Sequence, residues 1–373
     1  LFMVDEASMI ANLGLGGTTF GSGCLLDDLV HFVYQGHNDR LLLIGDKAQL
    51  PPVGEEESPA LSAAMLQGYG LSVYECDLNE VVRQSQQSGI LFNATRIRQM
   101  ITHDDITQLP KIRFSGFSDI REMPGAELIE ALGDSYHQVG LDDTIVVTRS
   151  NKRANIFNQG IRNMVLDREE ELESGDMLMI VKNNYYWMEE ERKKIKEREE
   201  RRVKSEETAF GGRRESQFNS LTNHKVQSSN LKVQSNELPA FLANGDRAKV
   251  MKVSHRIELY GFHFATLLLK FPDYDNYELE ATVLLDTLTS EAPALTHDQQ
   301  EQLFHKIEED YQDIPLKADR MKAIRQDPYF NALQVKFAYA VTCHKAQGGQ
   351  WSHVYVDQGY MTDDMLTPDY IHW

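Results

Sequence analysis

Cysteine is scarce in this chain of 373 residues, and long apolar runs are absent. The three cysteines, Cys24, Cys76 and Cys343, are widely spaced and form no C-x-x-C pair, which argues against a disulfide framework and a cysteine zinc site. No run approaches the roughly 20 apolar residues that a membrane-spanning helix requires. These absences predict a protein of the reducing cytoplasm with no part in a membrane.

Basic residues are also few, since 38 Lys and Arg stand against 57 Asp and Glu, a net charge of −19. Such a chain does not coat nucleic acid by bulk electrostatics, although a narrow basic groove on an acidic body is compatible with this balance. Its hydrophobic content of 41% is enough for two or three domains with cores of their own.

Two short apolar runs, residues 1–4 and 41–44, each end in a polar turn, as buried parallel strands of a nucleotide-binding sheet do. After the first run, Asp5 can hold a magnesium ion through water and Glu6 can orient and deprotonate an attacking water. The alternative is an ordinary strand end with a solvated turn. After the second run, the carboxamide of Gln49 can contact a γ-phosphate and a water at once, unless this is only a polar loop stiffened by the two prolines that follow.

Arg83 lies where the pattern changes toward a second α/β domain. Its guanidinium can reach across a cleft and neutralise charge on a γ-phosphate, or it can simply pair with Glu80 one helical turn away. Residues 88–101 follow with helical spacing of their apolar positions.

The second domain continues through a buried strand at 144–147 and a helix capped by Ser150, and it resumes at 337–341 after a long insertion. Gly-Asp turns before two strands inside the insertion predict a small β-barrel. Residues 189–236 are highly charged and then polar, which predicts an exposed, mobile hairpin with a solvated helix, or an arm that orders on a nucleic acid or a partner protein.

The segment 342–350 reads Thr-Cys-His-Lys-Ala-Gln-Gly-Gly-Gln. The Thr342 hydroxyl can bind a nucleic-acid phosphate or cap the next turn, and the basic pair His344 and Lys345 favours contact with nucleic acid. Gly348 allows close approach of the backbone to a phosphate, and Gln347 is expected to face a nucleotide. No second ligand at suitable spacing supports a metal role for His344.

In this order, the segments around Asp5–Glu6, Gln49 and Thr342–Gly348 resemble motifs II, III and V of superfamily 1 helicases, and specifically of the RecD-like (exonuclease V α-subunit) type. The resemblance implies an α/β fold of tandem RecA-like P-loop NTPase domains, the first one partial, with an inserted SH3-like β-barrel. It also implies an ATP-dependent 5′→3′ DNA helicase that uses ATP and Mg²⁺ and moves on single-stranded DNA. By this likeness Glu6, Gln49 and Arg83 are catalytic, Asp5, Gln347 and Gly348 bind nucleotide and metal, and Thr342, His344 and Lys345 contact DNA.

The domain boundaries that follow are 1–80 for the first RecA-like part, 81–172 and 331–373 for the second, and 173–330 for the barrel with its arm at 189–236. No G-x-x-x-x-G-K-[ST] phosphate loop occurs in the sequence, and no motif VI is reached. We therefore expect an internal, by itself inactive fragment of a larger enzyme, with protein partners in DNA repair or recombination.

Two other functions compete with this prediction. One is a non-catalytic nucleic-acid-binding or protein-interaction module derived from a helicase. The other is a nuclease, which the residues do not support, because the acidic clusters at 103–105 and 357–364 lack the spaced carboxylates and Lys of a two-metal site.

Overall fold

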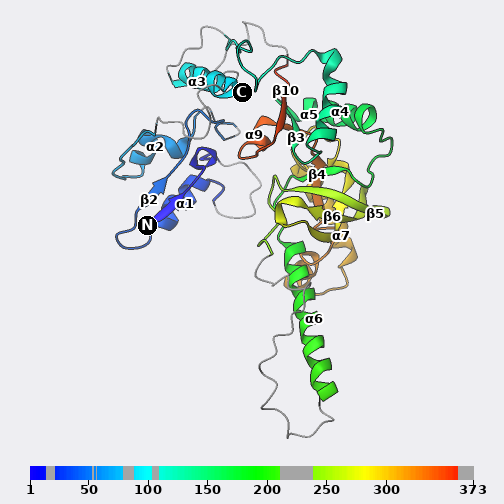
Figure 1. Cartoon of the computed structure of the whole chain (residues 1–373). Helices are drawn as coiled ribbons and strands as arrows, with labels where there is room; N and C mark the ends of the chain where they lie inside the picture. Colours follow the sequence, from blue (N-terminus) through cyan, green and yellow to red (C-terminus); the bar gives the residue numbers. More distant parts are fainter. Residues whose placement is uncertain are drawn as a thin grey trace, which may run out of the picture. The chain divides into compact units, whose positions relative to one another are not determined.

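The computed structural model describes most of the chain as two compact units (Figure 1). One unit comprises residues 1–128 and 357–373, and the other comprises 129–356. The described residues are 1–13, 22–52, 54–55, 57–78, 88–102, 109–210 and 238–359. Among them, no helix is both long and apolar enough to cross a membrane.

The first unit is built on two parallel strands, β1 (Phe2–Val4) and β2 (Leu41–Leu43), with Phe2 opposite Leu41. The sequence predicted parallel strands at these two apolar runs, and the parallel pairing is confirmed. The prediction that the strands are buried is wrong, because no residue of either strand is buried and Met3 is 68% exposed. Helix α1 (Leu25–Val33) packs one apolar face on the core of this unit and buries Leu26 and Val30. The remaining helices and turns are η1 (Ala7–Met9), η2 (Pro59–Leu61), α2 (Ala63–Gly68), α3 (Gly89–Thr102) and η3 (Gly125–Glu127).

The second unit contains a parallel sheet in the order β10–β3–β9, whose strands are β3 (Thr144–Thr148), β9 (Ala340–Thr342) and β10 (His353–Val356). The predicted strand at 144–147 is confirmed. Ser150 caps the next helix as predicted, since its hydroxyl accepts from the Arg153 amide at 3.3 Å. The helices of this part are α4 (Leu128–Gln138), α5 (Asn151–Gly160), the π-helix η4 (Ile161–Val165) and α9 (Cys343–Ala346).

A closed five-stranded barrel is inserted between β3 and β9, which confirms the predicted barrel. Its strands are β4 (Met177–Ile180), β5 (Arg247–Leu259), β6 (Phe262–Phe271), β7 (Tyr277–Leu284) and β8 (Leu333–Phe337), with the short turns η5 (Pro272–Tyr274) and η6 (Leu285–Thr287).

The strand predicted at 337–341 is divided between two sheets, and this corrects the prediction. Phe337 ends β8 of the barrel, and the sheet strand β9 begins only at Ala340. The division arises because the side chain of Asn158 holds the crossover, donating to the carbonyls of Phe337 and Ala340 at 3.2 and 2.9 Å. The barrel thus extends to Phe337 and beyond the predicted boundary at 330.

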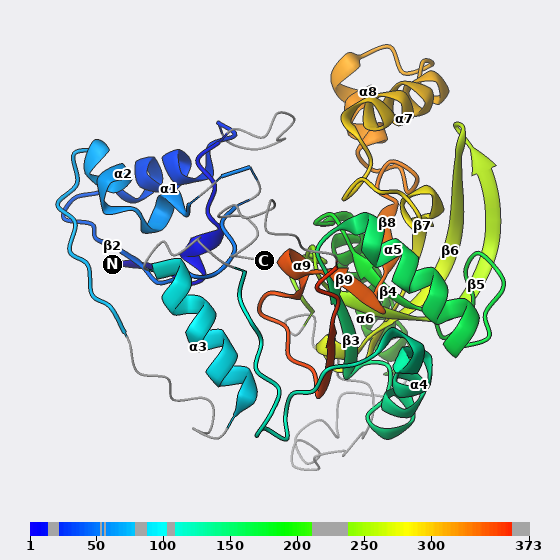
Figure 2. The ribbon, with the colours of Figure 1, turned by 90° about the horizontal axis from the view of Figure 1, so that it is seen from above.

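Helix α6 (Tyr186–Phe210) projects from the barrel in Figure 1. Pairs such as Lys193–Glu190 at 2.7 Å stabilise its exposed turns, in line with the predicted solvated helix. Helices α7 (His297–Asp310) and α8 (Lys317–Ile324) lie together in Figure 2 and share an apolar cluster with β6.

Candidate functional site

The carboxyl end of β1 presents two acids. Asp5 and Glu6 are exposed, and the Asp5 carboxylate accepts from the Glu6 amide at 2.9 Å. Glu6 has a φ of +52°, in the left-handed region that a non-glycine residue adopts at a cost. Among the described residues the Glu6 carboxylate has no hydrogen bond or ion pair, and it is open to solvent.

Gln49 lies beside this acidic strand end. The Ser8 hydroxyl donates to Oε1 of Gln49 at 3.0 Å. Gly45 makes this approach feasible, because a Cβ at residue 45 would lie 2.9 Å from the backbone nitrogen of Ser8. The structure therefore brings together Asp5, Glu6 and Gln49 at one edge of the strand pair, as the parallel arrangement predicted. Ser8 was missed by the sequence reasoning, although its place two residues after Glu6 was a usable signal.

A second contact missed in the sequence joins helix α3 to the turn after β2. Arg98 donates to both carboxylate oxygens of Asp46, with the Nη1 to Oδ1 distance at 3.0 Å. This bidentate ion pair fixes the start of the loop that carries Gln49. Arg83, predicted to act in this region, lies outside the described residues.

Thr342 and His344 lie in the second unit, at the start of α9. Thr342 is the N-cap residue, but its side chain makes no capping bond, so the capping alternative is not realised. Among the described residues its hydroxyl makes no hydrogen bond. Burial lowers the pKa of His344 below its ordinary value, which keeps the imidazole neutral at pH 7.

The segment after α9 contains two buried polar atoms with no hydrogen-bond partner among the described residues. They are Oε1 of Gln347 and the indole nitrogen of Trp351. Gly348 has a φ of +77°, and a Cβ at Gly349 would lie 2.0 Å from the Trp351 ring. The backbone conformation thus favours glycine at 348, and the Trp351 side chain leaves no room for a Cβ at 349 unless it moves. The unsatisfied Gln347 oxygen is a candidate contact for a ligand.

The side chain of Lys345 points into the interior of the second unit. Its ammonium is buried and has no hydrogen-bond partner in the described part of the chain. It lines a cavity of about 10 Å³ together with Lys336 of β8 and Thr342. The prediction that Lys345 contacts DNA stays a prediction, but in the structure its ammonium lies in the interior.

The oxygen ligands at the carboxyl end of β1 allow one mode of magnesium binding. Mg²⁺ prefers oxygen ligands and commonly keeps several waters. Asp5 offers such an oxygen, whereas no group of three or more His, Cys, Asp or Glu in the described ranges is arranged to hold a metal. The donor set therefore suits an ion bound through one carboxylate, water and phosphate oxygens, and not a site made of protein ligands alone.

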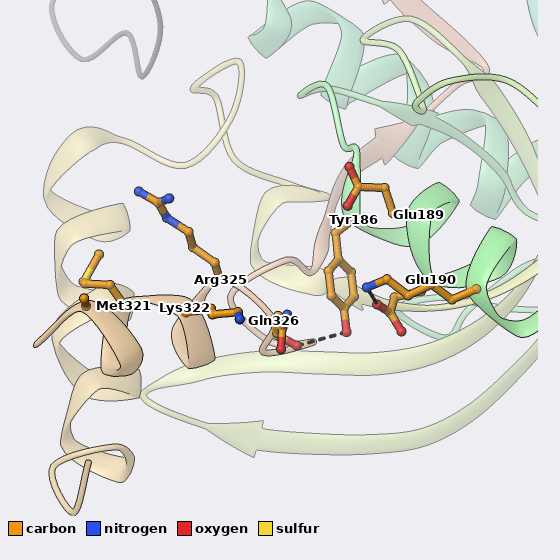
Figure 3. A pocket seen from close by; sticks show the side chains of 9 residues that line it. Tyr186, Glu189, Glu190, Met321, Lys322, Arg325 and Gln326 are labelled. Atoms are coloured by element: carbon orange, nitrogen blue, oxygen red, sulfur yellow. Dashed lines mark hydrogen bonds and ion pairs between the residues drawn. The ribbon is translucent and has the colours of Figure 1, made fainter. Parts of the chain in front are cut away.

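A larger pocket, of about 480 Å³, lies apart from all the predicted site residues. It is formed by the base of α6 and by α8, and the Tyr186 hydroxyl spans it to the Gln326 carbonyl at 3.1 Å (Figure 3). Its lining mixes the acids Glu189 and Glu190 with Lys193, Lys322 and Arg325. This mixture gives no clear preference for a ligand of either charge.

Residues 337–373 match the family model of the UvrD-like helicase C-terminal domain. The match covers β9, α9 and β10, and it supports a superfamily 1 helicase, with the nucleic-acid binding that such a domain suggests. The predicted superfamily is therefore supported, and the RecD-like subtype stays a prediction. No curated protein matches the chain in sequence.

Proposed function

We propose that this chain carries the nucleotide-hydrolysing and DNA-binding groups of an ATP-dependent 5′→3′ DNA helicase of the RecD-like type. The proposal rests on the carboxyl end of the β1–β2 pair. There the Glu6 carboxylate has no partner among the described residues, and the Ser8–Gln49 hydrogen bond joins the segment of Glu6 to that of Gln49. The UvrD-like match at 337–373 supports the superfamily.

At this edge each residue has a distinct role. Asp5 binds magnesium through water, and Glu6 accepts the proton of the attacking water. The bond from Ser8 fixes the carboxamide oxygen of Gln49, while the amide nitrogen has no partner in the described part of the chain. That nitrogen is free to donate to a phosphate oxygen. Magnesium-bound ATP supplies the phosphoryl group whose transfer drives movement, and Arg83 is proposed to neutralise its charge.

In the second unit, the unpartnered hydroxyl of Thr342 and the neutral ring of His344 are proposed to contact single-stranded DNA. Gln347 and Gly348 are proposed to contact the nucleotide, because the buried Gln347 oxygen needs a donor. These contacts are proposed to change with the nucleotide state, so that the protein binds the DNA strand at a new position after each cycle.

A non-catalytic nucleic-acid-binding or protein-interaction module is the second candidate. The observation that favours it is helix α6, whose charged turns project from the barrel and can contact a nucleic acid or a partner protein.

The test is ATP hydrolysis by the full-length protein that contains these residues, with and without single-stranded DNA. Glu6→Gln is expected to lower the DNA-stimulated rate by about 10²–10⁴-fold and to leave ATP and DNA binding intact, since a general base contributes on this scale. Glu57→Gln changes another exposed acid of the same unit and is the matched control. DNA binding without any DNA-stimulated hydrolysis in the unmodified protein would favour the module instead.

A further inference from the structure

An arginine of the barrel contacts the segment that follows α9. Arg247 is the first residue of β5, and its guanidinium carbon lies 5.6 Å from the centre of the Trp351 ring. At this distance the positive charge is attracted by the face of the indole, and the attraction is strengthened because the Arg247 side chain is only 16% exposed. The barrel is therefore joined to Trp351 by a partly desolvated cation–π contact.

The same guanidinium is fixed by two further partners. One terminal nitrogen donates to the carbonyl of Asp142 at 2.6 Å, and the other lies 3.5 Å from a carboxylate oxygen of Asp273. Asp142 precedes β3 of the parallel sheet, whereas Asp273 belongs to η5 of the barrel. Arg247 thus has a defined position between barrel and sheet, and it holds the Trp351 ring at that position.

The other edge of the Trp351 ring lies against the turn that carries Gln347. The ring touches the backbone at Gly349, since a Cβ there would lie 2.0 Å from it. The Gly349 amide closes the turn by donating to the Ala346 carbonyl at 3.1 Å. The indole nitrogen has no hydrogen-bond partner among the described residues, so the ring is held by packing and not by its polar atom.

The residue after Trp351 is anchored as well. The Ser352 amide donates to the Asp143 carboxylate at 3.0 Å, and the Ser352 hydroxyl donates to the other oxygen of the same carboxylate. The backbone on the carboxyl side of Trp351 is therefore tied to the start of β3. With this end fixed, the position of the ring determines the room that is left for the turn at 347–349.

We propose that Arg247 and Trp351 are positioning residues, through which the barrel holds the turn at 347–349 in the conformation that binds nucleotide. This inference rests on the proposed function, because it takes Gln347 and Gly348 as nucleotide contacts. It adds a part for the barrel in nucleotide binding, although Arg247 acts only through Trp351. Without the contact the turn samples other conformations, and the apparent affinity for ATP falls with the fraction that stays competent.

The experiment measures DNA-stimulated ATP hydrolysis by the full-length protein with Arg247→Ala and with Trp351→Ala. We expect each substitution to raise KM for ATP about 3–10-fold, in the range of one cation–π contact, and to change kcat less than about twofold. The double variant is expected to match Trp351→Ala, because either substitution removes the same contact. Arg256→Ala is the matched control with an unchanged KM, since Arg256 also lies on β5 and donates to a backbone carbonyl, that of Leu172 at 2.6 Å.

A second measurement detects the contact without ATP. In protein labelled with 5-fluorotryptophan, the fluorine resonance of Trp351 is assigned by its loss in Trp351→Phe. We expect this resonance to shift in Arg247→Ala and to stay in place in Arg256→Ala, because only Arg247 faces the ring.

Two kinds of failure can be told apart. If the unmodified protein hydrolyses ATP and Arg247→Ala leaves KM unchanged, the positioning role is overturned and the proposed function stands. Effects on KM that multiply in the double variant would show that the two residues act separately, and would likewise overturn the positioning role. Absence of DNA-stimulated hydrolysis in the unmodified protein would overturn the proposed function itself, and this inference with it.

Discussion

At the scale of single residues, Asp176 is a buried charge that several donors hold. Its side chain is fully buried and accepts from Arg162 Nε at 3.1 Å, from Arg168 at 2.5 Å and from the Tyr339 hydroxyl at 2.8 Å. Asp176→Asn removes the counter-charge of a guanidinium that is itself 2% exposed, and breaking a buried pair in this way costs about 3–5 kcal/mol. We expect a loss of that size in the free energy of unfolding, measured in urea.

The control for Asp176→Asn is Glu170→Gln. The Glu170 side chain is 70% exposed and reaches Arg256 at 3.4 Å, so its replacement is expected to change stability by less than about 0.5 kcal/mol. Equal effects of the two substitutions would show that the Asp176 network is not a stabilising feature of the fold.

A second residue-scale prediction concerns the pH dependence of stability. Burial lowers the pKa of Lys336 to about 8 from the model-peptide value of 10.5. Between these values the unfolded state binds more protons than the folded state, so stability is expected to rise with pH in this window. Below pH 8 the cost of burying the charge is present in full, and above 10.5 it is gone.

The measurement is the free energy of unfolding at several values between pH 8 and 10. Lys336→Met is expected to reduce its slope by up to about 1.4 kcal/mol per pH unit. Lys322→Met, at an exposed lysine of α8, is the control. Identical slopes for the unmodified protein and Lys336→Met would refute the buried-ammonium account.

At the scale of elements, one side-chain amide makes four hydrogen bonds to the crossover from β8 to β9. Asn158 donates to the carbonyls of Phe337 and Ala340, and its Oδ1 accepts from the amides of Tyr339 and Ala340 at 3.1 and 2.8 Å. Asn158→Ala leaves these backbone groups without their partner, and each orphaned buried group costs about 1–3 kcal/mol.

We therefore expect Asn158→Ala to lower the free energy of unfolding by more than about 3 kcal/mol. Asn163→Ala, an exposed Asn of the π-helix that follows α5, is the matched control, with an expected change below about 0.5 kcal/mol. A loss in Asn158→Ala no larger than in the control would mean that the crossover is held by other contacts.

The same crossover shows where sequence reasoning reaches its limit. Strands such as β2 and β3, and the cap at Ser150, depend on residues within a few positions of one another, so local patterns predicted them. The division between β8 and β9 depends on Asn158, which lies about 180 positions away in the sequence. No local pattern carries that information.

The candidate site likewise combines residues that a local pattern predicts with contacts between distant segments that no local pattern predicts. The acids Asp5 and Glu6 follow a recognisable strand, whereas the Ser8–Gln49 and Arg98–Asp46 contacts join segments 41 and 52 positions apart. The inward position of the Lys345 ammonium depends on packing between α9, β8 and α5. A basic pair in the sequence indicates charge, but it does not indicate which way a lysine points.

At the scale of the whole molecule, the described residues form two units with separate cores. One core gathers around Leu26 and Val30 of α1, and another joins the barrel to α7 and α8. The first unit also leaves large apolar side chains of its strand pair exposed, with Met3 at 68% and Leu42 at 45%. Parallel strands are normally covered on both faces, so this unit gains less from burial.

We therefore expect two thermal transitions in calorimetry of the chain, with the first unit unfolding at the lower temperature. Leu26→Ala removes a fully buried side chain at a cost of about 2–5 kcal/mol and should lower only the first transition. Asp176→Asn should lower only the second, since its partners Arg162, Arg168 and Tyr339 all belong to residues 129–356. A single transition that both substitutions lower equally would show that the two cores unfold as one cooperative body. The two units would then differ in their contacts but would not unfold independently.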